Sequence, residues 1–187
     1  MKGVRRNRVR IIGGQWRRRL LDFPDAAGLR PTGDAVREKL FNWLGQELDG
    51  WHCLDLFAGS GALGFEAASR GAAQVVMIES NRAVCQALQA NQAALQADNI
   101  RIECADGVQW LRRPQSVSTA AKFDLVLLDP PFSLGVYSEL LATLPALLKS
   151  EAYVYVEHDG SLQVPDSWRL WRADRAGRVH FCLLRAA

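Results

Sequence analysis

Cysteine and histidine are scarce in this sequence, and neither is clustered. Its 187 residues include four cysteines and three histidines, with no CxxC pair and no histidine cluster. The cysteines are Cys53, Cys85, Cys104 and Cys182. Scattered cysteines of this kind fit neither a disulfide framework nor a zinc site. We therefore expect no bound metal and a reducing, cytoplasmic environment.

Long apolar runs are absent as well. No stretch approaches the roughly 20 apolar residues that a membrane-spanning helix needs, and no apolar segment follows the basic N-terminus, as it would in a secretory signal. The 49% hydrophobic and 23% charged content is that of an average globular protein and excludes wholesale disorder. The length suits about one domain with a sizeable core. We expect a globular protein without membrane contact.

Charge is distributed unevenly along the chain. The formal net charge is only +3, yet residues 1–19 hold eight basic side chains and no acidic one. Seven of the eight are arginines, whose planar guanidinium groups can bind phosphate at two points. Apolar residues interleave with them around the turn signal Gly13-Gly14, which predicts a β-hairpin with a phosphate-binding face rather than a disordered basic tail. The candidate residues for contact with nucleic acid are Arg5, Arg6, Arg8, Arg10, Arg17, Arg18, Arg19 and Arg30.

Beyond a loop at 22–31, helix-like and strand-like segments alternate. Strands are predicted at 52–57, 74–78, 100–104, 123–128 and 153–156. Helices are predicted at 36–48 with Thr32 as its cap, 62–70, 81–97 with Asn81 as its cap, 108–112, and 134–149 with a bend at Pro145. A loop is predicted at 114–121, and a final antiparallel hairpin at 168–173 and 178–184.

This alternation predicts an α/β fold. We expect a doubly wound, seven-stranded, mostly parallel sheet with an antiparallel C-terminal strand and an N-terminal β-hairpin extension. Residues 1–30 would form the basic extension, and residues 31–187 the main domain.

A glycine-rich loop follows the strand at 52–57. Gly59, Gly61 and Gly64 satisfy GxGxxG ahead of a helix, where glycines allow close approach and the helix start favours negative charge. Glu79 stands twenty positions after Gly59, and its carboxylate could accept hydrogen bonds from two ribose hydroxyls. A nicotinamide or flavin dinucleotide, S-adenosylmethionine and a purely structural turn all remain open at this point.

Asp55 favours S-adenosylmethionine among these alternatives. It stands at the carboxyl end of its strand, where its charge would repel a pyrophosphate but attract the ammonium and sulfonium groups of the methyl donor. Asp106, after the strand at 100–104, is placed to bind an adenine amino group or to cap the short helix, and the two roles are compatible. We therefore expect S-adenosylmethionine as the cofactor.

A second motif, Asp129-Pro130-Pro131-Phe132, enters the same crevice after the strand at 123–128. Neither proline has an N–H, so the Pro130 carbonyl and the Asp129 carboxylate are left as neighbouring acceptors. They could accept both hydrogens of an exocyclic base amine and orient its nitrogen toward the sulfonium methyl, while the base stacks on Phe132. No metal or covalent nucleophile is then needed. The alternative is that the prolines only end a strand and Phe132 only fills core.

These motifs resemble those of class I methyltransferases that methylate exocyclic amines. The N-terminal runs Arg10-Ile-Ile-Gly-Gly14 and Arg30-Pro-Thr-Gly-Asp34, with the segment 36–44, are similar to the bacterial 16S ribosomal RNA guanine-N2 methyltransferase family, the guanine-966 enzymes. The resemblance covers roughly residues 8–185. It implies a monomeric enzyme that methylates N2 of a guanine in 16S RNA, on assembled or partly assembled small ribosomal subunits.

The resemblance also implies which residues form the site. Asp129, Pro130, Pro131 and Phe132 would handle the guanine amine, with Phe132 where the wider amine-methylating group commonly has tyrosine. The implied donor-binding residues are Thr32, Asp55, Phe57, Ala58, Gly59, Ser60, Gly61, Glu79, Ser80, Asp106 and Gly107.

Other functions stay open on the residues alone. The same chemistry could act on adenine N6 in DNA or RNA, or on a protein glutamine. The hairpin alone would suit a non-catalytic RNA-binding assembly factor, and the glycine loop alone a nicotinamide oxidoreductase. The arginines favour nucleic acid, whereas the choice of guanine comes from the family resemblance only.

Overall fold

The computed structural model describes residues 6–26, 29–113 and 122–187. A central sheet has seven strands in the order β5-β4-β3-β6-β7-β9-β8. They are β3 (His52–Asp55), β4 (Gln74–Glu79), β5 (Ile100–Cys104), β6 (Phe123–Leu128), β7 (Leu148–His158), β8 (Trp168–Ala176) and β9 (Val179–Ala186). The pairs from β5 to β7 are parallel, and β9 runs against both β7 and β8. The predicted mostly parallel, seven-stranded sheet with an antiparallel C-terminal strand is therefore confirmed.

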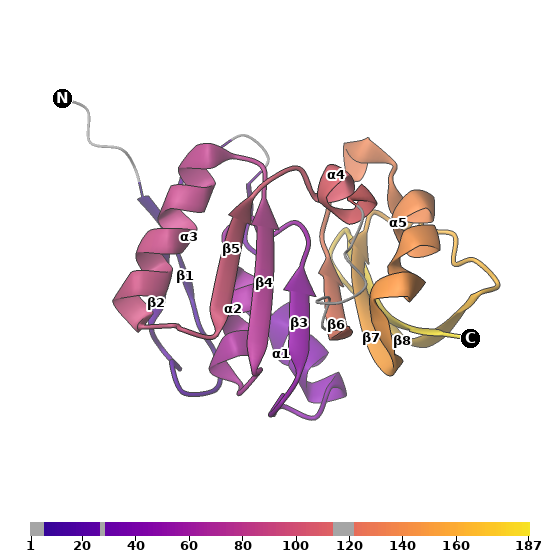
Figure 1. The fold of residues 1–187 in the computed structure, drawn as a ribbon, viewed down its shortest axis with the longest axis horizontal. Helices are drawn as coiled ribbons and strands as arrows, with labels where there is room; N and C mark the ends of the chain where they lie inside the picture. The colour runs from indigo at the N-terminus through magenta and orange to yellow at the C-terminus, as the bar shows by residue number, and fades with distance from the viewer. Residues whose placement is uncertain (1–5, 27–28, 114–121) are drawn as a thin grey trace.

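Helices cover both faces of the sheet. They are α1 (Asp34–Trp43), α2 (Ala62–Ser69), α3 (Arg82–Leu95), α4 (Gly107–Arg112) and α5 (Tyr137–Thr143), with the short 3-10 helices η1 (Phe132–Leu134) and η2 (Leu144–Leu147). Figure 1 shows α1 and α2 behind the sheet and α4 and α5 in front of it. The inner strands are therefore apolar on both sides: Leu125 and Leu127 of β6 belong to one buried cluster, and Val126 and Leu128 to the other. Within the described residues, no helix is long and apolar enough to cross a membrane.

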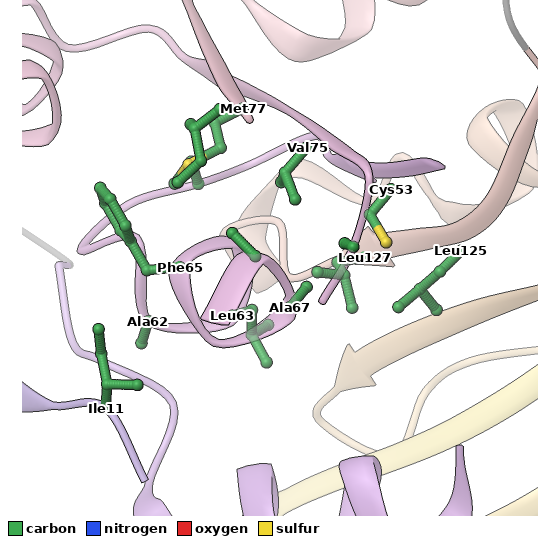
Figure 2. Packing of buried hydrophobic residues seen from close by; sticks show 14 of the residues in the cluster. Ile11, Cys53, Ala62, Leu63, Phe65, Ala67, Val75, Met77, Leu125 and Leu127 are labelled. Atoms are coloured by element: carbon green, nitrogen blue, oxygen red, sulfur yellow. The ribbon is translucent and has the colours of Figure 1, made fainter. Parts of the chain in front are cut away.

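The N-terminal segment shares the core of the sheet. Figure 2 shows Ile11 beside Ala62 of α2, in the cluster that also contains Phe65 and Met77. Ile11 and Leu21 are both 0% exposed. Full burial of an aliphatic side chain of this size contributes roughly 1.5–3 kcal/mol. Apolar packing thus fixes the N-terminal segment against α2.

The predicted N-terminal hairpin is confirmed, with a longer connection than expected. β1 (Arg6–Arg10) and β2 (Leu20–Pro24) pair antiparallel, with Arg10 opposite Leu20. The connection spans residues 11–19 rather than a two-residue Gly13-Gly14 turn. Gly14 has a φ of +73°, and a Cβ there would lie 1.8 Å from the Ser69 carbonyl oxygen. This position therefore requires glycine, because the loop backbone lies directly on the end of α2.

The loop predicted at 22–31 begins later, because Asp22 and its two successors belong to β2. The Asn91 side chain of α3 holds this strand. Its amide donates to the Asp22 carbonyl at 2.8 Å, and its oxygen accepts from the Asp22 N–H at 3.1 Å. Packing of α3 against β2 therefore gives hydrogen-bond partners to backbone groups on the outer side of β2, which have no partner strand among the described residues.

The first main-domain helix is shorter than predicted, and its cap is different. α1 ends at Trp43 instead of continuing to position 48, because the backbone at Gly45 and Gln46 has positive φ. The N-cap residue is Gly33, with no side-chain hydrogen bond. Thr32 is therefore not the cap, and its hydroxyl lies 3.5 Å from Asp129 Oδ2 instead. The predicted caps Asn81 on α3 and Asp106 on α4 are confirmed.

The helix predicted at 134–149, with a bend at Pro145, is wrong as a single helix, although the helical geometry of the chain does change near Pro145. The chain instead forms η1, then α5, then η2, and enters β7 at Leu148. Gly135 ends η1 with a φ of +58°, and Pro145 supplies no N–H for a continuing α-helix. β7 is accordingly longer than the predicted 153–156, whereas β3 ends at Asp55 rather than position 57. The C-terminal hairpin is confirmed, although β8 continues to Ala176 rather than ending at position 173, and β9 begins at Val179 and continues to Ala186. The loop predicted at 114–121 lies outside the described residues.

Candidate active site

An acidic residue ends almost every parallel strand of the sheet. Asp55 and Glu79 are the last residues of β3 and β4, and Asp129 directly follows β6. Asp106 lies two residues beyond β5, and Glu157 lies near the end of β7. The carboxyl ends of parallel strands meet at one edge, where α/β proteins bind their ligands. This edge is therefore acidic, which favours a cationic ligand over a pyrophosphate.

The glycine loop connects β3 to α2 at this edge. The Gly59 N–H donates to Glu79 Oε2 at 2.9 Å, and the Asn81 N–H donates to Glu79 Oε1 at 2.7 Å. Gly61 has a φ of +79°, and a Cβ there would lie 2.6 Å from the Leu88 side chain. The loop can thus turn tightly into α2 only with glycine at position 61. Glu79 retains unused lone pairs for hydroxyl donors of a ligand.

Asp55 lies beneath this loop. It is 1% exposed, and its Oδ2 accepts a hydrogen bond from the Gly64 N–H at 3.0 Å. Burial raises the pKa of Asp55 to about 7, although the hydrogen bond from Gly64 partly opposes the rise. The Asp55 carboxylate thus holds the backbone at the start of α2. The sequence, by contrast, predicts that its charge lies exposed in the crevice.

We expect Asp55→Asn to stabilise the folded chain more at pH 8 than at pH 5. The folded pKa of about 7 lies above the usual 3.8, so the folded state binds the proton more tightly than the unfolded state. Its stabilising contribution is complete below about pH 4 and is lost as the pH rises through 7. At about 1.4 kcal/mol per pKa unit, the loss is on the order of a few kcal/mol.

Urea unfolding of both proteins at the two pH values measures this effect. Asn keeps an oxygen that can accept from Gly64 but carries no charge to desolvate. Asp98→Asn is the matched control, because Asp98 is exposed. An Asp55→Asn difference in unfolding free energy that is equal at pH 5 and pH 8 would contradict the raised pKa.

The other predicted donor-binding residues lie around the same loop. Phe57 is half-buried, and its ring lies against α4, since a Cβ on Gly107 would come within 3.1 Å of it. Asp106 is exposed and accepts from the Gln109 N–H at 2.8 Å, so it caps α4 while leaving one oxygen free. Within the loop, Ala58 and Ser60 are buried, whereas Ser80 after β4 is exposed. The structure therefore brings the predicted residues of β3, β4 and β5 to one edge.

The Asp129-Pro130-Pro131-Phe132 motif begins at the same edge. β6 pairs directly with β3, with Leu127 opposite Asp55, so the motif lies beside the glycine loop. Pro130 is buried, and Phe132 is 39% exposed at the start of η1. Burial and the charges of Glu157 and Asp55 raise the pKa of Asp129 well above its usual value. The motif thus offers a carboxyl group that binds protons tightly, next to an accessible aromatic ring.

Sequence reasoning missed Glu157, which completes this acidic group. Leu128 of β6 lies opposite Val156 of β7. The next residue of each strand is acidic, so Asp129 and Glu157 lie at neighbouring positions on adjacent strands. Glu157 is 4% exposed, and its Oε1 accepts from the Tyr155 hydroxyl at 2.9 Å. Burial raises its pKa, with the hydroxyls of Tyr155 and Thr32 opposing the rise. The available signal was an acidic residue directly after a predicted strand, as at the other strand ends.

The predicted RNA-contacting arginines are largely exposed. On β1, Val9 is buried and its neighbours Arg8 and Arg10 are exposed on the other face of the strand. Arg8 forms an ion pair with Asp22 at 2.8 Å, and Arg10 forms one with Asp34 at 3.0 Å. The arginines of the 11–19 loop and the one after β2 are also exposed: Arg17, Arg18, Arg19 and Arg30. Arg5 and the side chain of Arg6 lie outside the described part of the chain. The hairpin therefore presents its basic side chains to solvent while its apolar side faces the core.

A buried ionic cluster, which the sequence also did not reveal, connects this hairpin to the domain. Glu66 of α2 is 0% exposed and accepts from the Ile12 and Gly13 N–H groups at 2.9 and 2.7 Å. The same carboxylate pairs with Arg37 at 3.1 Å and with Arg70 at 2.9 Å. α2 thus carries the glycine loop at its start and the hairpin loop near its end.

The strand order, the helices on both faces and the glycine loop at the carboxyl edge are the fold of class I S-adenosylmethionine-dependent methyltransferases. The chain belongs to the family described as Conserved hypothetical protein 95, whose model matches residues 9–185. The family resemblance of the sequence motifs is thereby confirmed.

Individual relatives cover nearly the whole chain. It is 45% identical over 180 residues to ribosomal RNA small subunit methyltransferase D of Escherichia coli K12, covering 94% of this chain and 88% of the relative. It is 40% identical over 181 residues to the protein of the same name from Haemophilus influenzae, covering 94% and 92%. A solved Escherichia coli structure, provisionally named methyltransferase yhhF, matches with a TM-score of 0.83 and 43% identity, covering 96% and 98%.

Proposed function

We propose that this chain transfers a methyl group from S-adenosylmethionine to the exocyclic N2 of a guanine in 16S ribosomal RNA. The observation that carries the proposal is the Asp129-Pro130-Pro131-Phe132 turn, which ends β6 beside the glycine loop of β3. Relatives at 45% and 40% identity are named as small-subunit ribosomal RNA methyltransferases, which supports the substrate class. The choice of guanine rests on the family resemblance of the motifs.

The acidic edge fits this methyl donor. When bound, S-adenosylmethionine supplies a methyl group on a positively charged sulfur, which is already activated for transfer. Glu79 would accept from the ribose hydroxyls with the lone pairs left by Gly59 and Asn81. The free oxygen of Asp106 would accept from the adenine amino group, and the buried carboxyl groups would favour the sulfonium charge.

Asp129 and Pro130 would hold the acceptor base. The Asp129 carboxylate and the Pro130 carbonyl accept the two amine hydrogens, which fixes the nitrogen lone pair in one direction. Phe132, being 39% exposed, offers its ring to the flipped base. As the nitrogen gains the methyl group it must release a proton, and the raised pKa of Asp129 suits its carboxylate to take that proton up.

The N-terminal residues would bind the RNA backbone. We assign residues 1–30 as an RNA-contacting extension of a methyltransferase domain at residues 31–187, acting as a monomer on assembled or partly assembled small subunits. A ribosomal substrate would place the enzyme in the cytoplasm. Exposed arginines with an ordered backbone support this assignment, since they bind phosphate without losing loop entropy.

Replacing Arg17, Arg18 and Arg19 together with alanine should weaken binding of 16S RNA and lower its salt dependence. Each lost phosphate contact removes about 0.7–0.9 from the slope of log K against log salt, so the slope should fall by about 2. Deleting residues 1–19 would also weaken binding, but it removes Ile11, which is fully buried. Filter binding over a salt series measures the change.

A triple variant with the same loss of charge is the control for this experiment. Arg101, Arg112 and Arg113 are exposed and lie on β5 and around the end of α4. Their replacement with alanine should leave RNA binding nearly unchanged. Equal salt slopes for the hairpin variant and the unaltered chain would refute the hairpin assignment.

Nucleoside analysis tests the reaction itself. We expect N2-methylguanosine to be missing from one position of 16S RNA in cells that lack this chain, and restored by purified protein and methyl donor on small subunits. N6-methyladenosine as the product would replace guanine with adenine as the target. Binding of small subunits without any methyl transfer would favour an assembly factor.

A further inference from the structure

The C-terminal strands carry a second group of arginines. Residues 168–187 contain five arginines and a single acidic residue, Asp174. β8 is the end strand of the sheet, so no further strand of the described residues pairs with its outer side. We use the term β8 arginine edge for the exposed arginines and tryptophan of β8 together with one arginine in the turn to β9: Arg169, Trp171, Arg172, Arg175 and Arg178.

The charges of this edge are not neutralised by the protein. Asp174 of β8 pairs with Lys39 of α1, and Glu151 pairs with Arg185 of β9. Among the described residues, the four arginines of the β8 arginine edge form no ion pair. Arg169 also lies directly opposite Arg185 in the strand register. Glu151 offsets the charge of Arg185, so the unpaired charge at this position is that of Arg169.

An aromatic ring lies within this basic strand. Trp171 is 38% exposed, and the Arg172 and Arg185 guanidinium groups lie 5.2 and 5.4 Å from its ring centroid. The register of β8 against β9 shifts between Leu170 and Arg172, so Trp171 forms a bulge. An exposed indole among arginines combines the two features with which proteins bind single-stranded RNA, namely stacking and phosphate contact.

The position of the edge relative to the active site favours the same ligand. In the strand register, His180 of β9 lies opposite both Arg175 of β8 and His158 of β7. His158 directly follows Glu157, so the turn after β8 lies at the carboxyl edge of the parallel strands. β8 is three strands from β6, or about 14 Å at the usual strand spacing. Figure 1 shows β1 and β2 at the opposite end of the molecule from β8. The site therefore lies between two basic surfaces.

Protection of a sheet edge is the competing explanation for these charges. Charged side chains and bulges both prevent a free strand from pairing with another chain. Those features also make docking of a protein strand on β8 unfavourable. Protection alone, however, does not call for an exposed Trp171 beside Leu170, which is 52% exposed.

We propose that the β8 arginine edge is a second RNA-binding surface. It would hold the phosphates on one side of the target base while the N-terminal hairpin holds those on the other side. This inference rests on the proposed function, since it assumes an RNA substrate. The predicted consequence is that RNA affinity depends on both ends of the sheet.

Replacing Arg172, Arg175 and Arg178 with alanine in the full chain tests the proposal. Binding of unmodified 16S RNA transcribed in vitro should weaken about tenfold or more, and the salt slope should fall by about 2. The KM for RNA should rise while kcat at saturating RNA and the affinity for S-adenosylmethionine remain unchanged. The Arg101, Arg112 and Arg113 alanine variant, which loses the same charge, should change RNA binding less than twofold. Trp171→Leu should weaken binding severalfold without changing the salt slope.

The outcomes separate this proposal from its alternatives. Equal RNA binding by the β8 variant and the unaltered chain would overturn it, as would an equal loss in the control variant. Aggregation of the β8 variant with unchanged RNA affinity would assign the arginines to edge protection and overturn the proposal as well. If the unaltered chain bound no RNA, the proposed function would fail first, and this inference with it.

Discussion

Asp129→Ala is expected to lower kcat by about 10²–10³-fold, the usual cost of removing one preorganised charge-stabilising group. The carboxylate is proposed both to accept an amine hydrogen and to take up the released proton. Alanine provides neither function, and the Pro130 carbonyl alone leaves the amine free to rotate. Affinity for S-adenosylmethionine should change little, because the donor is assigned to the residues of β3, β4 and β5. Single-turnover methylation of small subunits and calorimetric titration with the donor measure the two quantities.

Asp129→Asn sharpens the test, because it keeps the size of the side chain. The amide retains one acceptor oxygen but turns a donor NH2 group toward an amine that also donates. It should therefore be almost as inactive as alanine. Asp98→Ala, an exposed site after α3, should retain full activity. Turnover like that of the unaltered chain in either Asp129 variant would exclude the proposed role.

The pH dependence of methylation should follow the same carboxyl group. Burial and the charges of Glu157 and Asp55 raise the pKa of Asp129. Below that pKa the group is protonated and cannot take up the amine proton, so activity should rise with pH and level off above it. Glu157→Gln removes one charge that raises the pKa, and the acid limb should then move to lower pH. An unmoved limb would mean that another group sets the profile.

The sequence predicted those parts of the fold that local patterns determine. Asp55, Glu79 and Asp129 stand at the ends of apolar strands in the sequence. Because alternating strands and helices form a parallel sheet, these residues could be predicted to meet at its carboxyl edge, as they do. The Asn81 cap was also predictable, since its side chain accepts from the Ala83 and Val84 N–H groups within the same turn. The prediction of a helix at 134–149 was wrong because it gave more weight to the apolar spacing than to the break at Gly135, and because it treated Pro145 only as a bend.

The parts that could not be predicted depend on contacts between distant segments. Arg37, Glu66 and Arg70 have the charges of ordinary solvent-exposed helix residues, yet all three are buried. Glu66 is bonded to the 11–19 loop, and Arg70 packs on Phe41. Glu157 was within reach, because it follows an apolar strand as Asp129 does. Its hydrogen bond from Tyr155, by contrast, reflects how β7 is placed in the finished sheet.

Glu66→Met is expected to lower the free energy of unfolding by about 3–5 kcal/mol, the usual cost of removing one partner of a buried ion pair. Methionine has a similar size, but its sulfur carries no charge and is only a weak hydrogen-bond acceptor. Arg37, which is 0% exposed, would keep only its ion pair with the partly exposed Asp34, and the Ile12 and Gly13 N–H groups would lose their acceptor. Since whole domains are stable by only about 5–15 kcal/mol, the variant should be close to unfolding at 37 °C. Urea unfolding measures the loss, and Glu47→Ala at an exposed position should change it little.

A double-mutant cycle with Arg37→Met shows whether the pairing itself is responsible. Arg37 also donates to the Thr32 and Arg10 carbonyls at 3.1 and 2.9 Å, so its own replacement is costly. If the charges are coupled, Arg37→Met should cost less in the Glu66→Met background than alone, by at least about 1 kcal/mol. Strictly additive losses would contradict an energetic pairing and leave only separate packing defects.

The same cluster should fix the hairpin, which is proposed to bind RNA, relative to the glycine loop. Glu66 holds the backbone of the 11–19 loop, and its helix begins at Gly61 in the glycine loop. In Glu66→Gln, kept folded at low temperature, one acceptor becomes a donor facing the Ile12 or Gly13 N–H. Amide hydrogen exchange should then accelerate at these two residues, and the KM for RNA should rise more than the Kd for the methyl donor. Unchanged protection of both amides would mean that apolar burial of Ile11 alone holds the hairpin in place.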